Sequence, residues 1–307
     1  MNWVTLVAVA VLSDSTSTYI DNYITDVYFK GRLAVAQKIF FGFSYVAIAL
    51  MLLFISGVNF EELVFSTVGI LVFAGIINAV ADITYYSAIE IEDATEVGIF
   101  FQLSPIIYLI AGVLFLGESI SLTQLLAFLV IFSAPLLIIF STRKKSRKIK
   151  FRAAMYVVIY IIIDVASNMI FLAANSESMD IYQEISFLLL GKGIGNILIV
   201  ICFPRLWKRW KNVLRASRGK VLRPLILDLI MILTYDIFYR MALLAAPVVA
   251  LASVATDATE PIMIFFLGLL FTIIWPRFGR EKLKKETILV HLLATALVVI
   301  GIILLQF

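Results

Sequence analysis

The sequence has little of what a disulfide-stabilised or zinc-binding protein needs. Its 307 residues include one cysteine, Cys202, and one histidine, His291. A single cysteine excludes an intrachain disulfide, and one cysteine with one histidine excludes a zinc motif built from these residue types. We therefore expect no metal and no cofactor, and we interpret Cys202 as a small buried hydrophobic residue.

Charge is also scarce, since charged residues make up 15% of the chain and hydrophobic residues 62%. A soluble globular domain is about 25% charged and about 45–50% apolar. This composition leaves more apolar surface than one core can bury, so we expect a membrane protein. Segment 121–141 agrees with this because its 21 residues carry no charge, and about 20 apolar residues cross a bilayer as a helix.

Long apolar stretches predict an all-α integral membrane protein with ten transmembrane helices and no soluble domain. The N-terminus lacks the basic start and the small-residue cleavage site of a signal peptide, so we expect a first span that is retained. The expected spans are 3–25, 33–55, 64–88, 92–117, 121–141, 153–175, 182–203, 224–246, 248–275 and 287–306.

Basic residues indicate the orientation of these spans. Of 25 Lys and Arg residues, 22 lie in odd-numbered connectors. Because short cytoplasmic loops carry the positive excess, we expect the odd connectors in the cytoplasm and both termini outside. We expect a multi-pass protein of the cell membrane, and we favour the cytoplasmic membrane of a prokaryote. The basic loops explain the net charge of +4, so we expect no nucleic acid as a partner. The basic loops also suit anionic lipid heads, although a topology signal alone explains them.

Two short motifs indicate an internal repeat. DITYYSA begins at Asp82 and DIFYRMA begins at Asp236, 154 residues later. We therefore divide the chain into two repeats of five spans, 1–148 and 149–307. Because five is odd, the second repeat is inverted, a plan that transporters use with the site at the repeat interface. Further matching pairs are Lys38 with Lys192, Asp14 with Asp164, Ala94 with Ala250, and Pro105 with Pro261.

One stretch carries a family resemblance. Residues 85–121, YYSAIEIEDATEVGIFFQLSPIIYLIAGVLFLGESIS, resemble the signature of the EamA-like branch of the drug/metabolite transporter superfamily. The resemblance implies ten helices in two inverted five-helix repeats around a central polar cavity, and the transport of small polar metabolites. The matching residues are Tyr85, Ala88, Pro105, Gly117 and Glu118, with Tyr239, Ala242, Ala250 and Pro261 in the second half.

Nine ionisable side chains lie deep inside the expected spans. Each would cost about 2.5–3.5 kcal/mol at mid-bilayer on insertion scales if it faced lipid, so such residues are functional candidates. Helical spacing places several on shared faces, as with Asp257 and Glu260 in span nine. Our candidates for substrate binding are Asp14, Asp82, Tyr85, Gln102, Asp164, Asn168, Asp236, Tyr239, Arg240, Asp257 and Glu260.

Some of these residues also have a structural interpretation. Asp236 and Arg240 are spaced as an ion pair within one helix, and we weigh this equally with a substrate role. Lys38 and Lys192 lie outside the cavity lining that the resemblance implies. We expect them to form structural ion pairs, Lys38 with Asp14 and Lys192 with Asp164.

Other candidate residues also have a structural and a functional interpretation. Pro105 and Pro261 are expected to remove a backbone hydrogen bond and open their helices beside the cavity. Tyr85 and Tyr239 are candidates to stack on a substrate, with helix packing as the alternative. Asp228 and His291 lie near span ends, where we expect them in water.

The leading hypothesis is a secondary transporter that works by alternating access on a small polar metabolite. The deep side chains include six acids and three bases, which favours an amino acid or another amine-bearing solute and makes the proton a candidate coupling ion. The alternative is a broad proton-driven exporter of organic cations. We expect no enzyme, because the TYD at 234–236 lacks the Gly-x-Gly-Asp that an intramembrane aspartyl protease needs. A monomer is expected, with a dimer as the alternative.

Overall fold

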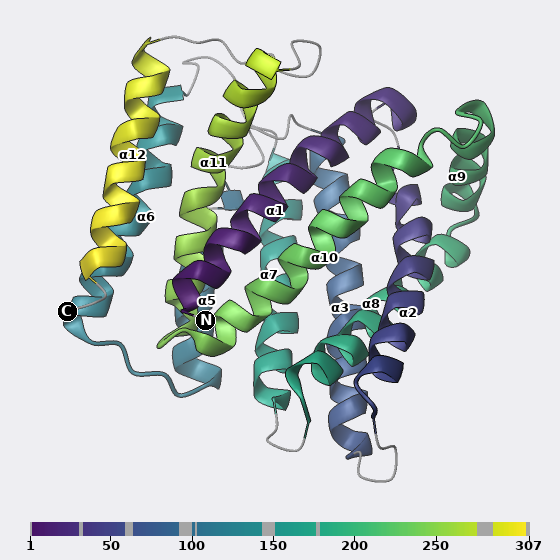
Figure 1. The fold of residues 1–307 in the computed structure, drawn as a ribbon, viewed down its shortest axis with the longest axis horizontal. Helices are drawn as coiled ribbons and strands as arrows, with labels where there is room; N and C mark the ends of the chain where they lie inside the picture. Colours follow the sequence, from purple (N-terminus) through teal and green to yellow (C-terminus); the bar gives the residue numbers. More distant parts are fainter. Residues whose placement is uncertain are drawn as a thin grey trace. The chain divides into compact units, whose positions relative to one another are not determined.

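The computed structural model describes residues 2–30, 33–58, 64–91, 100–101, 103–142, 151–175, 179–274 and 285–304. Every regular element in these ranges is a helix (Figure 1). In chain order they are α1 Trp3–Ile24, the π-helix η1 Thr25–Phe29, the 3-10 helix η2 Ala34–Gln37, α2 Lys38–Ile55, α3 Phe65–Ile89, α5 Ser104–Phe115, α6 Leu122–Thr142, α7 Phe151–Ala174, α8 Ile181–Cys202, α9 Pro204–Ala216, α10 Leu222–Ala245, α11 Val249–Ile274 and α12 Lys285–Leu304.

The all-helical prediction is confirmed for the described residues, and six helical segments are long and apolar enough to cross a membrane. They lie at Trp3–Phe29, Ala34–Ile55, Phe65–Ala88, Phe151–Ala174, Ile181–Cys202 and Val249–Leu270. Each of the other expected spans contains a helix that is shorter or more charged. α10, for example, carries four charged side chains along its length. Ten crossings therefore stay a prediction.

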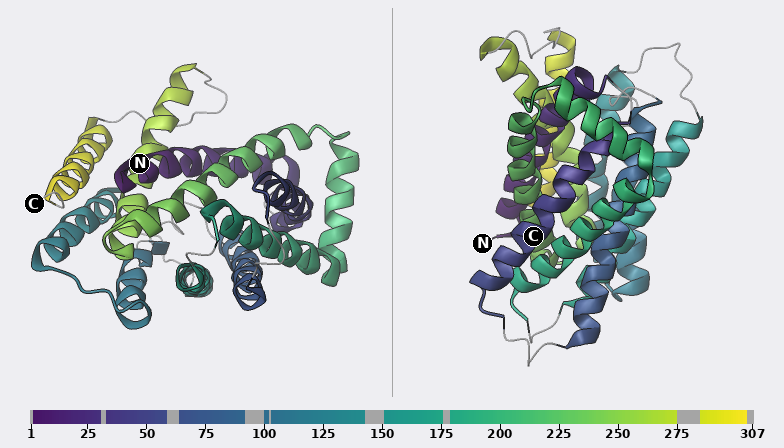
Figure 2. Two further views of the ribbon diagram at one scale, coloured as in Figure 1. Left: turned by 60° about the horizontal axis from the view of Figure 1, so that its bottom comes forward. Right: turned by 90° about the vertical axis from the view of Figure 1, so that its right-hand side faces the viewer.

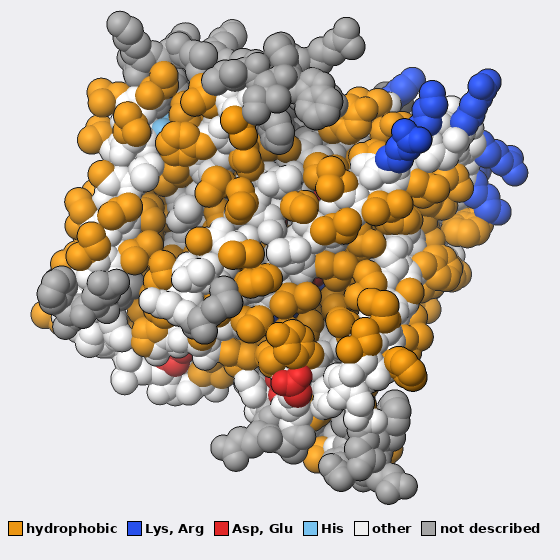
Figure 3. Space-filling view, viewed as in Figure 1, with side chains coloured by type: hydrophobic (Ala, Val, Ile, Leu, Met, Phe, Trp, Pro, Cys, Tyr) orange, Lys and Arg blue, Asp and Glu red, His pale blue; other side chains and the backbone are white. Residues whose placement is uncertain are grey.

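α9 is a helix where the sequence indicated only a basic connector. Its side chains separate sharply, because Leu206, Trp210 and Val213 are buried while Arg205 and Lys208 are exposed. Figure 3 shows Lys and Arg side chains gathered over this helix on a face that is otherwise largely hydrophobic. Sequence reasoning missed α9 because its apolar positions are too few for a membrane span and were counted as part of a loop.

The described chain forms two compact units that do not coincide with the two sequence halves. Unit 1 comprises Met1–Ile20, Gly98–Ile149 and Ile230–Phe307, and unit 2 comprises Asp21–Val97 and Lys150–Leu229. Each unit thus combines helices from residues 1–148 with helices from residues 149–307. The two halves as repeats stay a prediction.

Unit 2 is built on α3 and α8, which pack against each other, while α7 also packs against α3 and α2 against α8. Glycine allows the close approach of α3 and α8. A Cβ at Gly75 would overlap the backbone carbonyl oxygen of Leu188, and a Cβ at Gly191 would overlap that of Val72. Backbones this close have no room for any side chain, as is common where membrane helices pack.

Unit 1 is built on two helix pairs. α12 packs against α6, and Figures 1 and 2 show the two side by side. α11 packs against α5 and also contacts α6 and α12. Gly301 of α12 faces Ile131 of α6, where a Cβ would overlap the Ile131 side chain. The partners α5 with α11 and α6 with α12 hold the same place in the two sequence halves.

Candidate functional site

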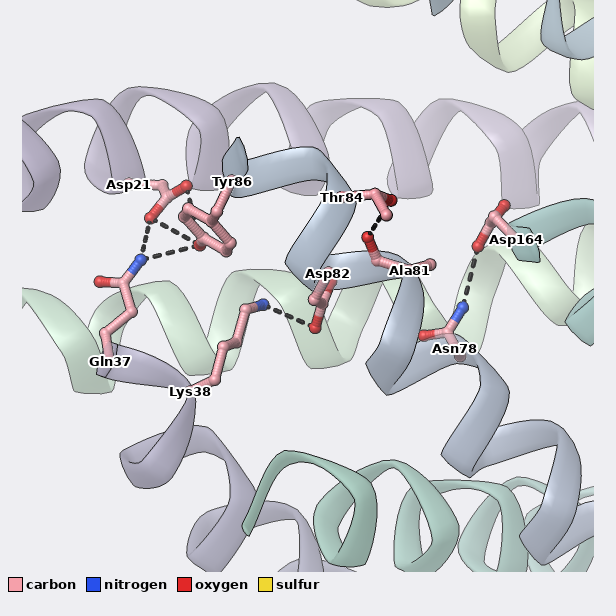
Figure 4. A network of polar contacts seen from close by, with 9 residues as sticks. All are labelled: Asp21, Gln37, Lys38, Asn78, Ala81, Asp82, Thr84, Tyr86 and Asp164. Atoms are coloured by element: carbon pink, nitrogen blue, oxygen red, sulfur yellow. Dashed lines mark hydrogen bonds and ion pairs between the residues drawn. The ribbon is translucent and has the colours of Figure 1, made fainter. Parts of the chain in front are cut away.

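A stripe of polar side chains runs along α3 in unit 2. Asn78, Asp82 and Tyr86 are spaced at four-residue intervals, which places them on one face of the helix. The Lys38 ammonium, at the start of α2, lies 2.9 Å from a carboxylate oxygen of Asp82 (Figure 4). The two side chains are 4% and 16% exposed, so the ion pair joins α2 to α3 in the interior.

A second polar cluster joins the end of α1 to the last residue of η2 and the last turns of α3. The Gln37 amide donates to an Asp21 carboxylate oxygen at 2.6 Å and to the Tyr86 hydroxyl at 2.7 Å. The Tyr86 hydroxyl in turn donates to Asp21 at 3.1 Å. Figure 4 shows the three side chains converging. Because Asp21, Gln37 and Tyr86 come from three different elements and bond to one another, this cluster is suited to fixing helices in place.

A third contact joins α3 to α7. The Asn78 amide donates to one carboxylate oxygen of Asp164 at 2.8 Å, and the Asn168 amide donates to the other at 3.2 Å. Ser167 of α7 also donates to the backbone carbonyl of Ala74 in α3, at 2.9 Å. Asp164 and Asn168 were both candidates for substrate binding, and here they tie two helices together.

The expected partner of Lys38 was wrong. We expected Asp14 of α1, but Lys38 pairs with Asp82 of α3. The offset between the halves predicts which residues correspond, and it does not predict which residues touch. The ammonium of Lys192 lies over the Tyr45 ring at 5.3 Å from its centroid, and its expected pairing with Asp164 stays a prediction.

The charged pair of α10 lies in unit 1. Arg240 donates through Nη1 to an Asp236 carboxylate oxygen at 2.8 Å and to the Asp236 backbone carbonyl at 2.9 Å. Arg240 is 2% exposed. Tyr239, on the neighbouring turn, stacks on Tyr235 with ring centroids 5.2 Å apart. The arrangement is that of an ion pair within one helix, which was one of the two interpretations.

Two carboxylates share one face of α11 in unit 1. Asp257 and Glu260 are three residues apart, and both are partly buried. The Ser253 hydroxyl lies 3.4 Å from an Asp257 carboxylate oxygen. In the part of the chain that the structure describes, Glu260 has no hydrogen bond or ion pair, and its charged neighbour is Asp257. Like charges thus lie side by side on an apolar helix.

Two side chains of unit 1 hold α11 from outside the helix. Glu118 accepts a hydrogen bond from the backbone N–H of Val249, the first residue of α11, at 2.9 Å. Burial raises the pKa of the Glu118 carboxyl above its usual value of 4.5, and the Val249 N–H partly opposes this rise. The Tyr19 hydroxyl of α1 donates to the Ile264 carbonyl at 2.9 Å. These contacts fix the helix that carries the two carboxylates.

The backbone differs at the two prolines. The expected span 92–117 is interrupted just before Pro105, since Phe101 is helical, Leu103 lies in a turn and α5 begins at Ser104. α11 continues from Val249 to Ile274 through Pro261, and Pro105 lies in the first turn of α5. A proline in the first turn removes no helical hydrogen bond. Within α11, Pro261 removes one bond and leaves the rest of the helix intact. An opening of either helix beside a cavity stays a prediction.

The remaining candidates are placed as follows. Tyr85 packs among aromatic rings, with centroids 5.2 Å from Tyr86 and 5.7 Å from Tyr160. Asp14 is partly buried on α1 in unit 1. Gln102 lies outside the described residues. The candidates therefore fall into two sets, one in each unit, and a shared cavity stays a prediction.

Comparison with known proteins supports the resemblance that residues 85–121 indicated. Residues 3–140 match the model of the EamA-like transporter family. The resemblance to the drug/metabolite transporters is confirmed. Members of this EamA-like family are membrane transporters, which agrees with a multi-pass helical protein.

A solved structure supports the fold of the whole chain. One crystal structure superposes with a TM-score of 0.63 at 16% identity, covering 98% of this chain and 95% of its own. At that identity the likeness concerns the fold alone. No curated protein sequence matches significantly. The EamA-like resemblance thus rests on the first half of the chain, and the second half is supported through the fold.

Three expectations about single residues were wrong. Cys202 is exposed at the end of α8, although apolar composition suggested burial, because in a membrane protein an apolar residue is equally suited to face lipid. Asp228 is 2% exposed, and its charge lies close enough to act on Lys38. His291 is 6% exposed and stacks on Phe265 at 3.9 Å between ring centroids.

Sequence reasoning missed Gln37 and Asn78, which complete the polar clusters of unit 2. A signal for Asn78 was present, since it precedes Asp82 by four residues and Tyr86 by eight, on one face of an apolar helix. Gln37 had no comparable signal, because it lies beside Lys38 at a helix start where polar residues are common.

Proposed function

We propose that this protein is a secondary transporter of a small amine-bearing metabolite, and that Asp257 and Glu260 of α11 bind the cationic group. The observation that carries the proposal is the Glu260 carboxylate, partly buried with no hydrogen bond or ion pair to another described residue. An ionised group in a span is costly unless a partner meets it. An ammonium group is a partner that suits it.

The charges around the pair favour a cation. Two carboxylates at this spacing repel each other, and a bound amine or a proton removes that repulsion. Ser253 adds a hydroxyl on the same face, which suits a polar solute. By contrast, the Arg240 guanidinium already forms an ion pair with Asp236 at 2.8 Å. Arg240 is therefore poorly suited to recognise an anionic substrate.

The architecture that we propose is ten spans in two inverted repeats, with both termini outside, working as a monomer by alternating access. Helix pairs at matching places in the two halves pack together, namely α2 with α8, α5 with α11 and α6 with α12. This pairing supports two related five-helix repeats. The proton is the coupling ion that we propose, since the same carboxylates can carry it.

Ligand binding to the purified protein tests the substrate class. A ligand that binds only the folded state raises the melting temperature by mass action. We expect lysine, putrescine or choline to raise the melting temperature of the detergent-purified protein, and glucose 6-phosphate to leave it unchanged. Stabilisation by glucose 6-phosphate alone would contradict the proposal and assign the site to the basic residues.

Amide variants test the two carboxylates. We expect Asp257→Asn and Glu260→Gln to fold, as judged by their melting temperature without ligand, and to lose the stabilisation by amines. Asp26→Asn, an exposed aspartate of η1, is the control and should keep it. Proteoliposomes loaded with the stabilising amine then report counterflow, which both α11 variants should abolish. Full counterflow in both variants would exclude the proposed site.

A further inference from the structure

A basic pocket of about 490 Å³ lies in unit 2, where the turn at 217–221 joins α9 to α10. Its walls come from the end of α1, from η1, from that turn and from the first turn of α10. The lining residues are Tyr23, Tyr28, Arg218, Gly219, Lys220, Arg223 and Pro224. Three of these seven side chains are cationic and none is acidic, so the pocket is suited to an anion.

The backbone of the turn adds to this preference. Arg218 has φ 52° and Gly219 has φ 76°, so two successive residues adopt the left-handed conformation. For a residue with a Cβ this conformation is uncommon and costs free energy, and such residues cluster at ligand sites. α10 begins at Leu222, and the N-terminus of a helix carries a partial positive charge. Side chains and helix end therefore favour the same ligand charge.

The wall opposite the turn is held in place by α9. Arg209 of α9 donates to the backbone carbonyl of Phe29, and its guanidinium lies over the Phe29 ring. Phe29 follows Tyr28 directly, and the Tyr28 ring contacts Tyr23 edge-on at 6.0 Å. The two phenol groups are thus held together, since the Tyr28 hydroxyl is hydrogen-bonded to that of Tyr23. The pair has one further O–H to donate to an oxyanion.

We propose that this pocket binds a phosphate ester. Arginine forks match the oxygens of a phosphate group, and lysine adds a point charge. Two sources carry this group, the head group of an anionic phospholipid and a soluble phosphate ester. The proposal does not depend on the carboxylates of α11, which lie in unit 1.

The surroundings of the pocket favour the lipid as the source. α9 is amphipathic and carries Trp207, which is 38% exposed and has the Lys211 ammonium over its ring at 4.8 Å. Exposed tryptophan beside lysine is typical of helices at the membrane interface. Figure 3 shows the basic side chains concentrated in this region. The other face of α9 also presents apolar surface, since Trp207 and Trp210 line a mostly apolar cavity of about 350 Å³ between α2 and α9.

The test compares two triple variants that remove the same charge. R218Q/K220Q/R223Q removes the cations of the pocket, and R205Q/K208Q/R215Q removes three exposed cations of α9 that do not line it. The probes are dihexanoyl phosphatidylglycerol, dihexanoyl phosphatidylcholine and glycerol 3-phosphate, and the measurement is the melting temperature in detergent. We expect phosphatidylglycerol to raise the melting temperature of the wild type and of the α9 variant by about 3 °C.

The pocket variant should lose that rise, while phosphatidylcholine should have no effect on any of the three proteins. A rise with glycerol 3-phosphate as large as that with phosphatidylglycerol supports the phosphate site and identifies a soluble ligand. Equal rises with the two lipids, an equal loss in both triple variants, or no rise with any probe would overturn the proposal. The melting temperature without ligand shows whether the pocket variant has folded.

Discussion

Units 1 and 2 bury similar polar groups and use them differently. In unit 2, Lys38 with Asp82 joins α2 to α3, and Asn78 with Asp164 joins α3 to α7. In unit 1, the ion pair described is within α10, and Glu260 of α11 has no polar partner among the described residues. Polar groups that connect helices stabilise a rigid frame, whereas a carboxylate left beside another carboxylate is available to a ligand. We infer a structural role for these polar contacts of unit 2 and a binding role for α11.

Replacing Lys38 should have the largest effect on stability among the tests of this comparison. In Lys38→Met the Asp82 carboxylate loses its partner in the interior, and breaking a buried ion pair costs about 3–5 kcal/mol of unfolding free energy. We expect a clear fall in melting temperature in detergent. The double variant Lys38→Met/Asp82→Leu should recover much of the loss, since it leaves no unpaired charge. A single variant as stable as the wild type would show that water reaches Asp82 and that the pair does not hold unit 2 together.

Helix packing gives the next largest effect. Gly75→Ala places a methyl group on the Leu188 carbonyl oxygen, and forced overpacking costs about 1–3 kcal/mol or more. Gly69→Ala, on the same helix with open space around it, is the matched control and should be neutral or slightly stabilising. In unit 1, Gly301→Ala meets the Ile131 side chain, which can change rotamer, so its loss should be smaller. Equal effects at Gly75 and Gly301 would remove this difference between the units.

The sequence predicted some levels of this structure and not others, for physical reasons. Hydropathy places α7, α8 and the helical segment Ala34–Ile55 within two residues of their ends, because lipid imposes the length of an apolar helix. The repeat offset relates Lys38 to Lys192 as positions, which stays a prediction, and contacts such as Lys38 with Asp82 depend on how helices rotate about their axes. Periodicity does not determine that rotation when all faces of a helix are apolar. For the same reason Gln37 went unnoticed, although it is fully buried.

A smaller effect is expected at Tyr86. Tyr86→Phe removes the hydroxyl that donates to Asp21 and accepts from Gln37. A hydrogen bond to a charged group contributes about 1.5–3 kcal/mol, and a neutral one about 0.5–1.5 kcal/mol. We expect a loss of about 2 kcal/mol, measured by chemical unfolding in detergent. Tyr182→Phe is the control, because Tyr182 in the same unit is 49% exposed. A loss no larger than that of the control would mean that Asp21 and Gln37 satisfy each other without the phenol.

The smallest predicted effect concerns a feature that the two units share. Glu90 in unit 2 accepts from the Ala34 N–H at 3.1 Å, as Glu118 in unit 1 accepts from Val249. Burial raises the pKa of both carboxyls above 4.5, and the backbone N–H groups oppose the rise. The folded protein therefore binds their protons more tightly than the unfolded chain. Their stabilising contribution is fully present below about pH 4.5 and is lost as the pH rises through the raised pKa values.

The variant E90Q/E118Q keeps the hydrogen-bond acceptors and removes the titration. We expect the melting temperature of the wild type, relative to this variant, to fall as the pH rises from 4.5. The difference should be small, because both side chains are partly exposed and water screens their charge. A relative melting temperature that rises with pH would mean that the N–H groups outweigh burial and hold the carboxylates charged. In that case an ionised carboxylate would cap the start of η2 and the start of α11. The two units would then stabilise a helix start in the same way.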